Sequence, residues 1–513
     1  MRSLTIRSAD TFKRSALLQK STMSSTIFCV TTNGVKARTS HAIALLLTTP
    51  TTHWYTLAPS FVDHLMVLED SARDSVRDWQ KRSRLLYDDD AEQSDSIEDQ
   101  EMSRNSSFVA GATLSKLSLG GNSPLSTGEV SQDTLGDTLK RVRVAILVWL
   151  QGLVETEVTR NQILELRGKE AEDFAEALQK VLDWTRDDRK IRTLFPKSPT
   201  NEIQTLRRRC RRLLTNLAKQ SGELPPSLFL CEGVDRPGKD PVHGGGFADI
   251  YKGTYGDQCI ALKRIRMFIG ERRDAKKLRK MFFNETLVWR QLDHSSIVPF
   301  IGIWREEPDS VPYMILPWMA NGNAQHFVQD KAITAEVVLQ LLVDVIDGLV
   351  YLHAESIFHG DLCGKNILID KDHHARLCDF GLASLFSDPA SALYNPTSTQ
   401  SGGTTRWMAP EILAPGPGAN VRPTKHTDIY AFGCVGVELY SGQDPFTGIS
   451  DRDIILGVPR GLRPSNPGEG AFGRPPPPEV WQMFEKCWEG TAKERPEAAV
   501  VLKCLRDIQV ANR

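Results

Sequence analysis

The chain has 513 residues, of which 63 are Lys or Arg and 64 are Asp or Glu. This near balance gives no bulk attraction to nucleic acid or to an anionic membrane, so we expect no binding to nucleic acid. The nine cysteines include no C-x-x-C pair, which argues against a disulfide framework and favours a reducing compartment. No run approaches the ~20 apolar residues of a membrane span, and we expect no transmembrane segment.

The N-terminal part of the chain differs in composition from a folded domain. Residues 1–70 form a basic leader rich in Ser and Thr, whose first 62 residues hold one acid, Asp10, against seven Lys or Arg. A mitochondrial transit peptide fits this composition, but a disordered leader, or a start codon placed too early with Met23 as a later start, is favoured. Residues 71–134 are rich in Asp, Glu, Ser and Gly. They offer little apolar surface to offset chain entropy, so we predict a disordered linker.

Residues 135–222 have the pattern of an α-helical region. FPKSP at 195–199 must separate two helices. The run RRRCRR at 207–212 is either a nuclear signal or phosphate-binding patch, or the solvated face of the second helix. An apolar stripe passes through this run and favours the solvated face. We expect the region to dock a protein partner or the domain that follows it. The stripe of the first helix comprises Phe174, Leu178, Val181 and Leu182.

From about residue 228 the chain changes to β-like runs separated by turns. HGGGFADIYKG at 243–253 precedes CIALK, which ends in Lys263. A Gly-rich hairpin lets backbone N–H groups approach phosphate oxygens, because no Cβ stands in the way. The distinctive stretches that follow are FFNETLVWRQLDH (282–294), YMILPWMANGN (313–323), HGDLCGKN (359–366), CDFG (378–381), GGTTRWMAPE (402–411), HTDIYAFGCVGVEL (426–439) and CWEGTAKERP (487–496).

In this order and spacing, these stretches resemble the catalytic domain of eukaryotic protein kinases. WMAPE and CWEGTAKERP are similar to the tyrosine-kinase-like Ser/Thr group. The resemblance implies an α+β, bilobal protein kinase fold at 228–510. A small β-rich N-lobe would span about 228–317, and a larger helical C-lobe about 320–510.

The resemblance also implies ATP and Mg²⁺ as cofactors and a protein as substrate. Asp361 would accept the hydroxyl proton, and Lys263 would contact the phosphates while paired with Glu285. Asn366 and Asp379 would be the Mg²⁺ ligands. The positions implied for the nucleotide pocket are Val242, Gly244, Gly245, Gly246, Phe247, Ile250, Ala261, Lys263, Leu316 (the gatekeeper), Pro317, Trp318, Met319 and Leu368. The positions implied to support the site are Phe380, Gly381, Thr404, Glu411, Asp428 and Arg495.

Several positions depart from the family pattern. His243 and Ala248 stand where the first and third glycines of the Gly-rich loop are expected. Gly360 replaces an arginine that in many kinases pairs with a phosphate on the activation loop. Cys363 replaces a lysine that touches the transferring phosphoryl group, and its absence would slow the reaction. Lys365 is a candidate substitute for this lysine, the alternative being a solvent-exposed lysine.

Two functions follow from these residues. An active kinase that transfers the γ-phosphate to Ser/Thr hydroxyls is favoured, because Asp361, Lys263 and both metal-ligand positions are present. The alternative is a pseudokinase scaffold that binds nucleotide or partners without efficient phosphotransfer. Thr404 favours Ser/Thr specificity, whereas RWMAPE, shared with tyrosine kinases, keeps tyrosine or dual specificity open. The expected location is the cytoplasm, with the nucleus and the mitochondrion kept open.

Overall fold

The described residues of the computed structural model are 154, 157–186, 200–230, 232–236, 238, 240–244, 248–266, 272–307, 311–380, 384–385, 404–416, 422–468, 472 and 474–511. The chain divides into two compact units, and nearly all described residues belong to the second, Arg160–Arg186 with Asn201–Arg513. The predicted leader and acidic linker, residues 1–134, lie outside the described residues.

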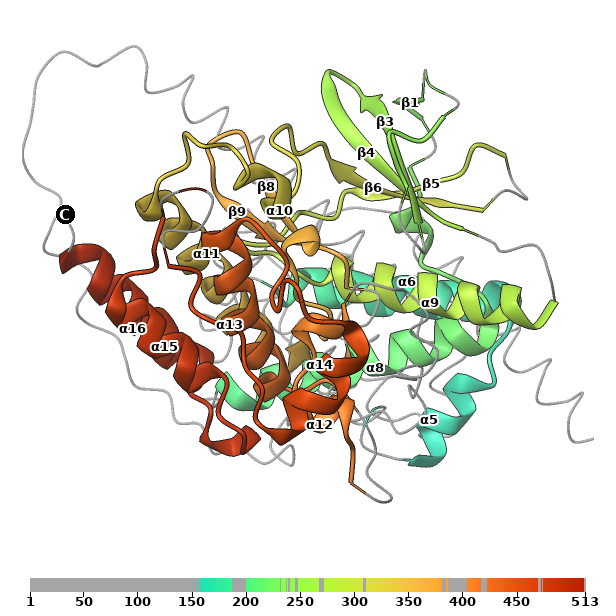
Figure 1. Ribbon diagram of the computed structural model, residues 1–513. Coiled ribbons are helices and arrows are strands. Elements are labelled where there is room, and N and C mark those ends of the chain that lie inside the picture. Colours follow the sequence, from blue (N-terminus) through green and yellow to red (C-terminus); the bar gives the residue numbers. More distant parts are fainter. Residues whose placement is uncertain are drawn as a thin grey trace, which may run out of the picture. The chain divides into compact units, whose positions relative to one another are not determined.

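One antiparallel sheet forms the β-rich lobe of the second unit, drawn in green and yellow in Figure 1. Its strands follow the order β1-β3-β4-β6-β5, and β2 pairs with β3. The long pair β3–β4 turns at Gly256, whose φ of +55° favours glycine. The helix α9 (Arg272–Arg290) follows β4. The strands are β1 (Val234–Asp235), β2 (His243–Gly244), β3 (Ala248–Tyr255), β4 (Gln258–Ile265), β5 (Gly302–Trp304) and β6 (Tyr313–Pro317).

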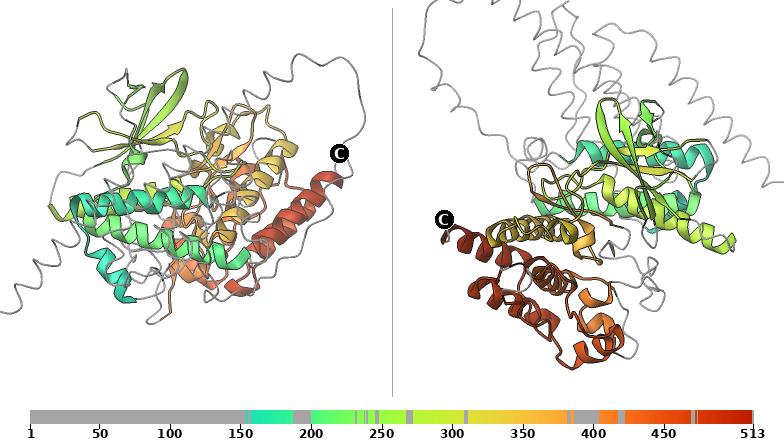
Figure 2. Two further views of the ribbon diagram at one scale, coloured as in Figure 1. Left: turned by 180° about the vertical axis from the view of Figure 1, so that it is seen from behind. Right: turned by 45° about the horizontal axis from the view of Figure 1, so that its top comes forward.

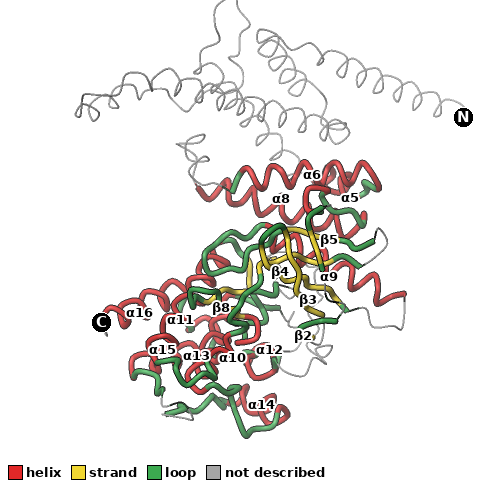
Figure 3. Tube along the Cα trace, turned by 90° about the horizontal axis from the view of Figure 1, so that it is seen from above, coloured by secondary structure: helices red, strands yellow, loops and turns green. Residues whose placement is uncertain are grey.

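The described residues after β6 form a helical lobe with two small sheets, β7–β10 and β8–β9. Figure 3 shows the helices of this lobe in red and the strands in yellow. One lobe built on a sheet and one built on helices confirm the predicted α+β bilobal fold. The helices are α10 (Ala324–Phe327), α11 (Ala335–Ala354), α12 (Pro410–Leu413), α13 (Lys425–Ser441), α14 (Asp451–Gly457), α15 (Pro478–Cys487) and α16 (Ala498–Ala511). The short strands are β7 (Ile357–Phe358), β8 (Ile367–Ile369), β9 (Ala375–Leu377) and β10 (Ser384–Leu385). The 3₁₀ turns are η3 (Pro226–Leu228), η4 (Gly364–Asn366), η6 (Thr405–Trp407), η7 (Val458–Arg460) and η8 (Ala492–Glu494).

Helix α11 is the core helix of the helical lobe. Among the helices that the structure describes, it alone is long and apolar enough to cross a membrane by length and composition. However, 61% of its apolar window is buried inside the fold, where it packs against α13 and α16. Burial in a protein core accounts for such a composition as well as a membrane does.

Helix α13 is buried along most of its length and begins and ends at clear signals. Thr424 forms a capping box with Thr427, and Gly442 ends the helix with a φ of +68°. A Cβ at Gly436 would overlap the ring of Phe484 on α15. Glycine at this position therefore permits the close packing of α13 on α15.

Among the described residues, three helices precede the sheet: α5 (Glu157–Leu164), α6 (Gly168–Trp184) and α8 (Thr200–Ser221). Helices α6 and α8 lie on either side of the predicted break at FPKSP, and residues 187–199 are outside the described ones. The prediction of a solvated face for RRRCRR is wrong for two of its arginines. Arg207 and Arg211 are 7% and 3% exposed, because both pair with Glu355 at the end of α11. An ion pair inside the fold thus replaces hydration.

Candidate active site

Lys263 on β4 lies between two carboxylates from distant parts of the chain. Its Nζ is 2.6 Å from Glu285 Oε1 on α9 and 3.0 Å from Asp379 Oδ1 after β9. The pair of Lys263 and Glu285 that the sequence predicts is therefore present. Burial lowers the pKa of Lys263, but the charges of Asp379 and Glu285 outweigh it and raise that pKa above its ordinary value. Lys263 is held as a cation.

The backbone that carries Asp361 is anchored by Asp428 on α13. Asp428 Oδ2 accepts from the His359 N–H at 3.0 Å, and Oδ1 accepts from the Gly360 N–H at 2.9 Å. The His353 ring is 2.9 Å from the same Oδ2. Asp428 is 1% exposed, so these bonds replace the water that a buried carboxylate needs. Asp428 thus bonds to the backbone at the place that the sequence predicts for it.

Asp361 is held by its own loop and by the segment before α12. Asn366 Nδ2 donates to Asp361 O at 2.8 Å and to its Oδ2 at 3.1 Å. Burial, and then the charge of Asp379, raises the pKa of Asp361 to about 6, while hydrogen bonds from Asn366 and Thr404 oppose the rise. The carboxylate therefore titrates just below neutral pH, in the range that suits a proton acceptor.

Asp379 and Phe380 occupy unusual but well-supported positions. Asp379 has a φ of +62°, a backbone conformation that a non-glycine residue adopts only when its surroundings hold it. Phe380 is fully buried, with its ring 5.1 Å from the Trp289 ring on α9 and 5.4 Å from the His359 ring. The segment thus packs onto both α9 and the loop of Asp361. The predicted Gly381 lies outside the described residues.

The residues predicted to wall a nucleotide come from both lobes. In the sheet, Ile250 pairs with Lys263, and Ala261 pairs with Leu316. Leu368 is in β8 of the other lobe. At the rim of the sheet, Val242 is 50% exposed. Of the predicted Gly-rich loop, the residues Gly245, Gly246 and Phe247 lie outside the described ones.

The segment Pro317 to Met319 joins the lobes after β6. The backbone N–H of Trp318 donates to the Cys259 carbonyl oxygen at 3.0 Å. This hydrogen bond is made to β4, so this N–H is not available to a ligand. The rings of Trp318 and His243 are stacked with centroids 6.5 Å apart. His243, which stands at a glycine position of the motif, therefore contacts the segment predicted to bind adenine.

Gly244 on β2 lies close to the side chain of Arg266. A Cβ there would overlap the Arg266 guanidinium, which is 2.6 Å from Asp249. Because that guanidinium is the end of a flexible side chain that is 38% exposed, a larger residue here would displace Arg266 from Asp249.

The two unusual side chains of HGDLCGKN differ in exposure. Cys363 is 2% exposed, and burial, with the charges of Asp361 and Glu438, raises the pKa of its thiol well above the ordinary value. Lys365 is exposed, and its charge acts on Glu438. At the position where the family pattern has a lysine, this chain therefore has a neutral, buried thiol.

Sequence reasoning missed Glu438 on α13, although it is an acid within the apolar run CVGVELY. It is fully buried, and its Oε2 accepts from the Gly364 N–H at 2.9 Å and from Trp407 Nε1 at 3.0 Å. Gly364 has no space for a Cβ beside this carboxyl. Burial raises the pKa of Glu438 to about 7. One carboxyl therefore ties the loop of Asp361 and the segment before α12 to α13.

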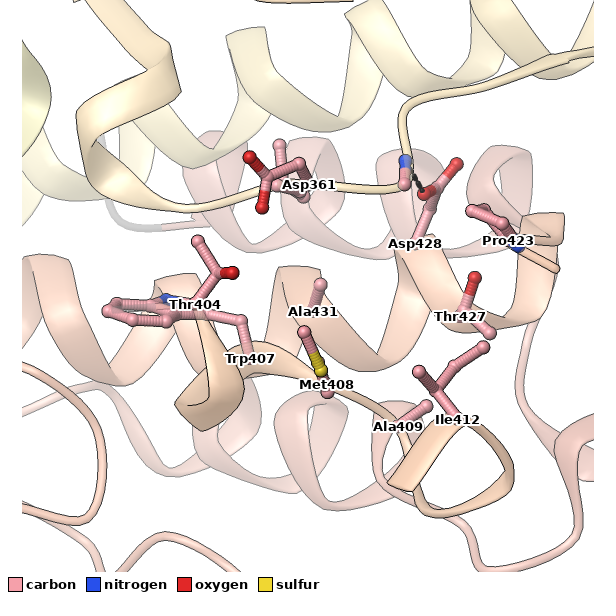
Figure 4. A pocket seen from close by; sticks show the side chains of 12 residues that line it. Asp361, Thr404, Trp407, Met408, Ala409, Ile412, Pro423, Thr427, Asp428 and Ala431 are labelled. Carbon is pink, nitrogen blue, oxygen red and sulfur yellow. Dashed lines mark hydrogen bonds between the residues drawn. The ribbon is translucent and has the colours of Figure 1, made fainter. Parts of the chain in front are cut away.

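A pocket opens between these two segments and α13 (Figure 4). It is a small, partly open hollow, and its walls include Asp361, Thr404, Met408 and Ile412. Figure 4 shows Asp361 and Thr404 near each other, and Asp428, on α13, bonded to the backbone of the loop that carries Asp361. The pocket places Asp361 at the wall of a hollow that it shares with the segment before α12 and with α13.

The last predicted supporting pair is also present. Arg495 binds both carboxylate oxygens of Glu411, NH1 to Oε1 at 2.7 Å and NH2 to Oε2 at 2.8 Å. The same guanidinium donates to Glu489 O and His426 O. It therefore joins α12 to the start of α13 and to the segment after α15.

The side-chain oxygens of Asp379 and Asn366 near Asp361 fit a magnesium ion that has few protein ligands. The Asp379 side chain is 41% exposed, and the Asn366 amide turns its nitrogen to Asp361. Because the amide nitrogen faces Asp361, the side-chain oxygen of Asn366 points away from Asp361. Mg²⁺ in phosphoryl-transfer sites takes one or two protein oxygens together with phosphate and water. No cluster of three or more His, Cys, Asp or Glu suited to a metal occurs among the described residues.

Comparison with known proteins gives the following matches. The sequence model of the family described as protein tyrosine and serine/threonine kinase matches residues 239–505. The chain is 28% identical over 271 residues to "Serine/threonine-protein kinase STY46" of Arabidopsis thaliana, covering 52% of this chain and 43% of that protein. It is 28% identical over 265 residues to "Serine/threonine/tyrosine-protein kinase HT1" of the same plant, covering 51% and 63%. It is 28% identical over 278 residues to "Tyrosine-protein kinase csk-1" of Caenorhabditis elegans, covering 53% and 46%. The chain thus spans less than two thirds of the length of these relatives.

Proposed function

Because the chain belongs to the family of protein tyrosine and serine/threonine kinases, we propose that it transfers the γ-phosphate of ATP to Ser or Thr hydroxyls of proteins. The observation that carries the proposal is the buried Lys263 held between Glu285 and Asp379. The two carboxylates hold Lys263 as a cation at a fixed place, which suits it to contact the phosphates of a nucleotide.

In the proposed reaction, each residue of the site has one task. Lys263, oriented by Glu285, contacts the α- and β-phosphates. Asp361, whose pKa is about 6, is ionised at neutral pH and accepts the proton of the attacking hydroxyl. Asn366 and Asp379 would hold Mg²⁺, which neutralises phosphate charge when bound. The walls of the nucleotide pocket would be Val242, Gly244, Ile250, Ala261, Leu316, Pro317, Trp318, Met319 and Leu368.

Thr404 supports the choice of Ser and Thr as acceptors. Its hydroxyl bonds to the Asp361 carboxyl, as expected for kinases with this specificity. Tyrosine or dual specificity is the runner-up, since the names of two relatives include tyrosine. The protein substrate itself and the cytoplasmic location stay predictions.

The pseudokinase alternative rests on the buried thiol of Cys363, where a cation would touch the transferring group. Under our proposal Lys365 supplies that charge instead. Replacing Lys365 with Ala should then lower kcat by about a hundredfold, as for other charge-stabilising groups, and Cys363→Lys should restore part of it. Steady-state kinetics with a generic protein substrate measures both variants, and an unchanged kcat in Lys365→Ala refutes this role.

A radiolabel experiment tests the enzyme assignment as a whole. The full chain is incubated with γ-labelled ATP, Mg²⁺ and generic protein substrates, followed by phosphoamino-acid analysis. We expect label on Ser and Thr for the wild type and none for Asp361→Asn. Asp372→Asn, at an exposed aspartate on the turn between β8 and β9, is the matched control and should act as wild type. Equal incorporation by wild type and Asp361→Asn contradicts the proposal, and phosphotyrosine alone contradicts the specificity.

A further inference from the structure

Helix α9, which carries Glu285, is covered on the side that faces away from the sheet. Every residue from Phe282 to Trp289 is buried. A helix buried on all sides must have partners on all sides. On the face toward β4 and the loop of Asp361, Lys263 contacts Glu285 and Phe380 contacts Trp289. Helices α6 and α8 supply the remaining partners, and Figure 2 shows them side by side.

Helix α6 contacts α9 through buried polar groups. Gln291 Nε2 donates to Gln179 Oε1 at 2.8 Å, and both side chains are at most 2% exposed. Asp183 Oδ2 accepts from Arg290 NH2 at 2.7 Å. Arg186 donates to the carbonyl of Arg290 at 2.6 Å. Each of these bonds fixes the C-terminal end of α9.

Helix α8 contacts α9 next to Glu285 itself. Lys219 Nζ donates to Asn284 Oδ1 at 3.0 Å, and Arg279 donates to the carbonyl of Gly222 just after α8. At about 100° per residue, Asn284, Arg290 and Gln291 lie about 100 to 140° around the helix from Glu285. The contacts of α6 and α8 are therefore on the half of α9 that is turned away from the ion pair.

The other end of the same interface reaches the helical lobe. Arg211 NH2 is 2.8 Å from Glu355 Oε2 and also donates to the Glu355 carbonyl, and Arg208 donates to Ser356 Oγ at 2.8 Å. Glu355 and Ser356 follow the last residue of α11 and directly precede β7, which leads to His359. Helix α8 therefore holds both α9 and the segment that leads into the loop of Asp361.

We propose that α6 and α8 are a built-in positioning element that keeps Glu285 against Lys263 and thereby raises kcat. The inference rests on the proposed kinase activity. Withdrawal of α9 from β4 would move it into the volume that α6 and α8 fill, and would break the bonds of Gln291 and Arg290. The positioning residues are Gln179 and Asp183 on α6 and Lys219 on α8.

Kinetics of the full chain test the proposal through Asp183. Asp183→Ala should lower kcat per active site about tenfold, the effect of losing one charged hydrogen bond, and Asp183→Glu should restore most of it. Asp173→Ala is the matched control, because Asp173 lies on the same helix and pairs with Lys169. Active sites are counted by nucleotide binding, so that loss of folded protein does not lower the measured kcat. A wild-type kcat per site in Asp183→Ala overturns the inference.

Hydrogen exchange of the wild-type chain provides a second test that needs no variant of α6. Saturation with Mg²⁺ and a non-hydrolysable ATP analogue should slow exchange in β3 and β4 and also in α6, because coupling between sites is reciprocal. In Glu285→Gln the slowing in α6 should disappear. Protection of β3 and β4 without protection of α6 overturns the inference alone. No protection in either region overturns the proposed nucleotide binding, and the inference with it.

Discussion

In the sequence, Gly360 replaces the arginine that the family pattern has in the catalytic loop. The backbone conformation of Gly360 explains why glycine fits there. Its φ is +76°, in the left-handed region that side chains disfavour, and its N–H is held by Asp428. The loop therefore takes this conformation without the strain that an arginine would add. The loss of the arginine removes a partner for phosphate, but it leaves the backbone that carries Asp361 in place.

Restoring a side chain at this position should therefore destabilise the fold. Gly360→Ala should lower the free energy of unfolding by about 1 to 2 kcal/mol, the cost of a Cβ in the left-handed region. Denaturant unfolding of the full chain measures it. Gly416→Ala is the control, because Gly416 is exposed and a Cβ there meets nothing within 4 Å. Equal stability of the two alanine variants would contradict the account of Gly360.

The pKa of Asp361 predicts the acid limb of the pH profile. With a pKa of about 6, the carboxylate is protonated below that pH, so kcat/KM should fall as pH drops through 6. The bond from Thr404 lowers this pKa, so Thr404→Ala should move the acid limb to higher pH. Thr405→Ala, a change at the neighbouring residue, should leave the limb in place. A limb that does not move in Thr404→Ala argues against the Thr404–Asp361 bond.

At the scale of elements, the periodicity of apolar residues and the spacing of motifs predict helix faces and the order of the lobes. The stripe containing Phe174 and Leu178 is buried in α6, and the order of the kinase motifs predicts the two lobes. Local pattern shows which face of a helix is apolar, but it does not identify the partner of that face. The burial of Arg207 and Arg211 depends on Glu355, about 144 residues further along the chain. The role of Glu438 likewise depends on Gly364 and Trp407, which only the fold brings to it.

Glu438 makes the packing of α13 sensitive to pH. Its folded-state pKa of about 7 lies above the ordinary 4.5, so its contribution to stability is lost as pH rises from 4.5 through 7. This difference corresponds to about 3 kcal/mol as an upper bound. Glu438→Gln should therefore gain stability relative to wild type as pH rises from 5 to 8.

Thermal unfolding of both proteins across this pH range measures the effect. Glu479→Gln, at an exposed glutamate on α15, is the control. If the difference between wild type and Glu438→Gln were the same at pH 5 and pH 8, Glu438 would not be the group that titrates.

At the scale of the whole molecule, a few buried ion pairs join segments that are far apart in the sequence. Arg495 connects α12 with the segment after α15, and Arg211 connects α8 with the end of α11. Such pairs fix the relative positions of elements, because a buried charge without its partner is strongly destabilising. The molecule thus depends on them for its arrangement more than for net stability.

Arg495→Lys should show this dependence. Lysine keeps the charge but cannot reproduce two parallel bonds to Glu411, so we expect a loss of about 3 kcal/mol in unfolding free energy. Denaturant unfolding tests it, with Lys493→Ala, at an exposed lysine two residues earlier, as control. A loss no larger than that of the control would mean that the bidentate pair contributes little.

The contacts of α6 and α8 with α9 have a practical consequence for recombinant work. The compact unit runs from Arg160, whereas the family match begins at residue 239. A fragment that starts at the match would expose Leu287 and Gln291, which are at most 2% exposed in the whole unit. Such a fragment would expose the apolar face of α9, together with a polar side chain that has lost its partner, and would tend to aggregate. Expression trials should therefore retain the helices from residue 160 onward, even when only catalysis is of interest.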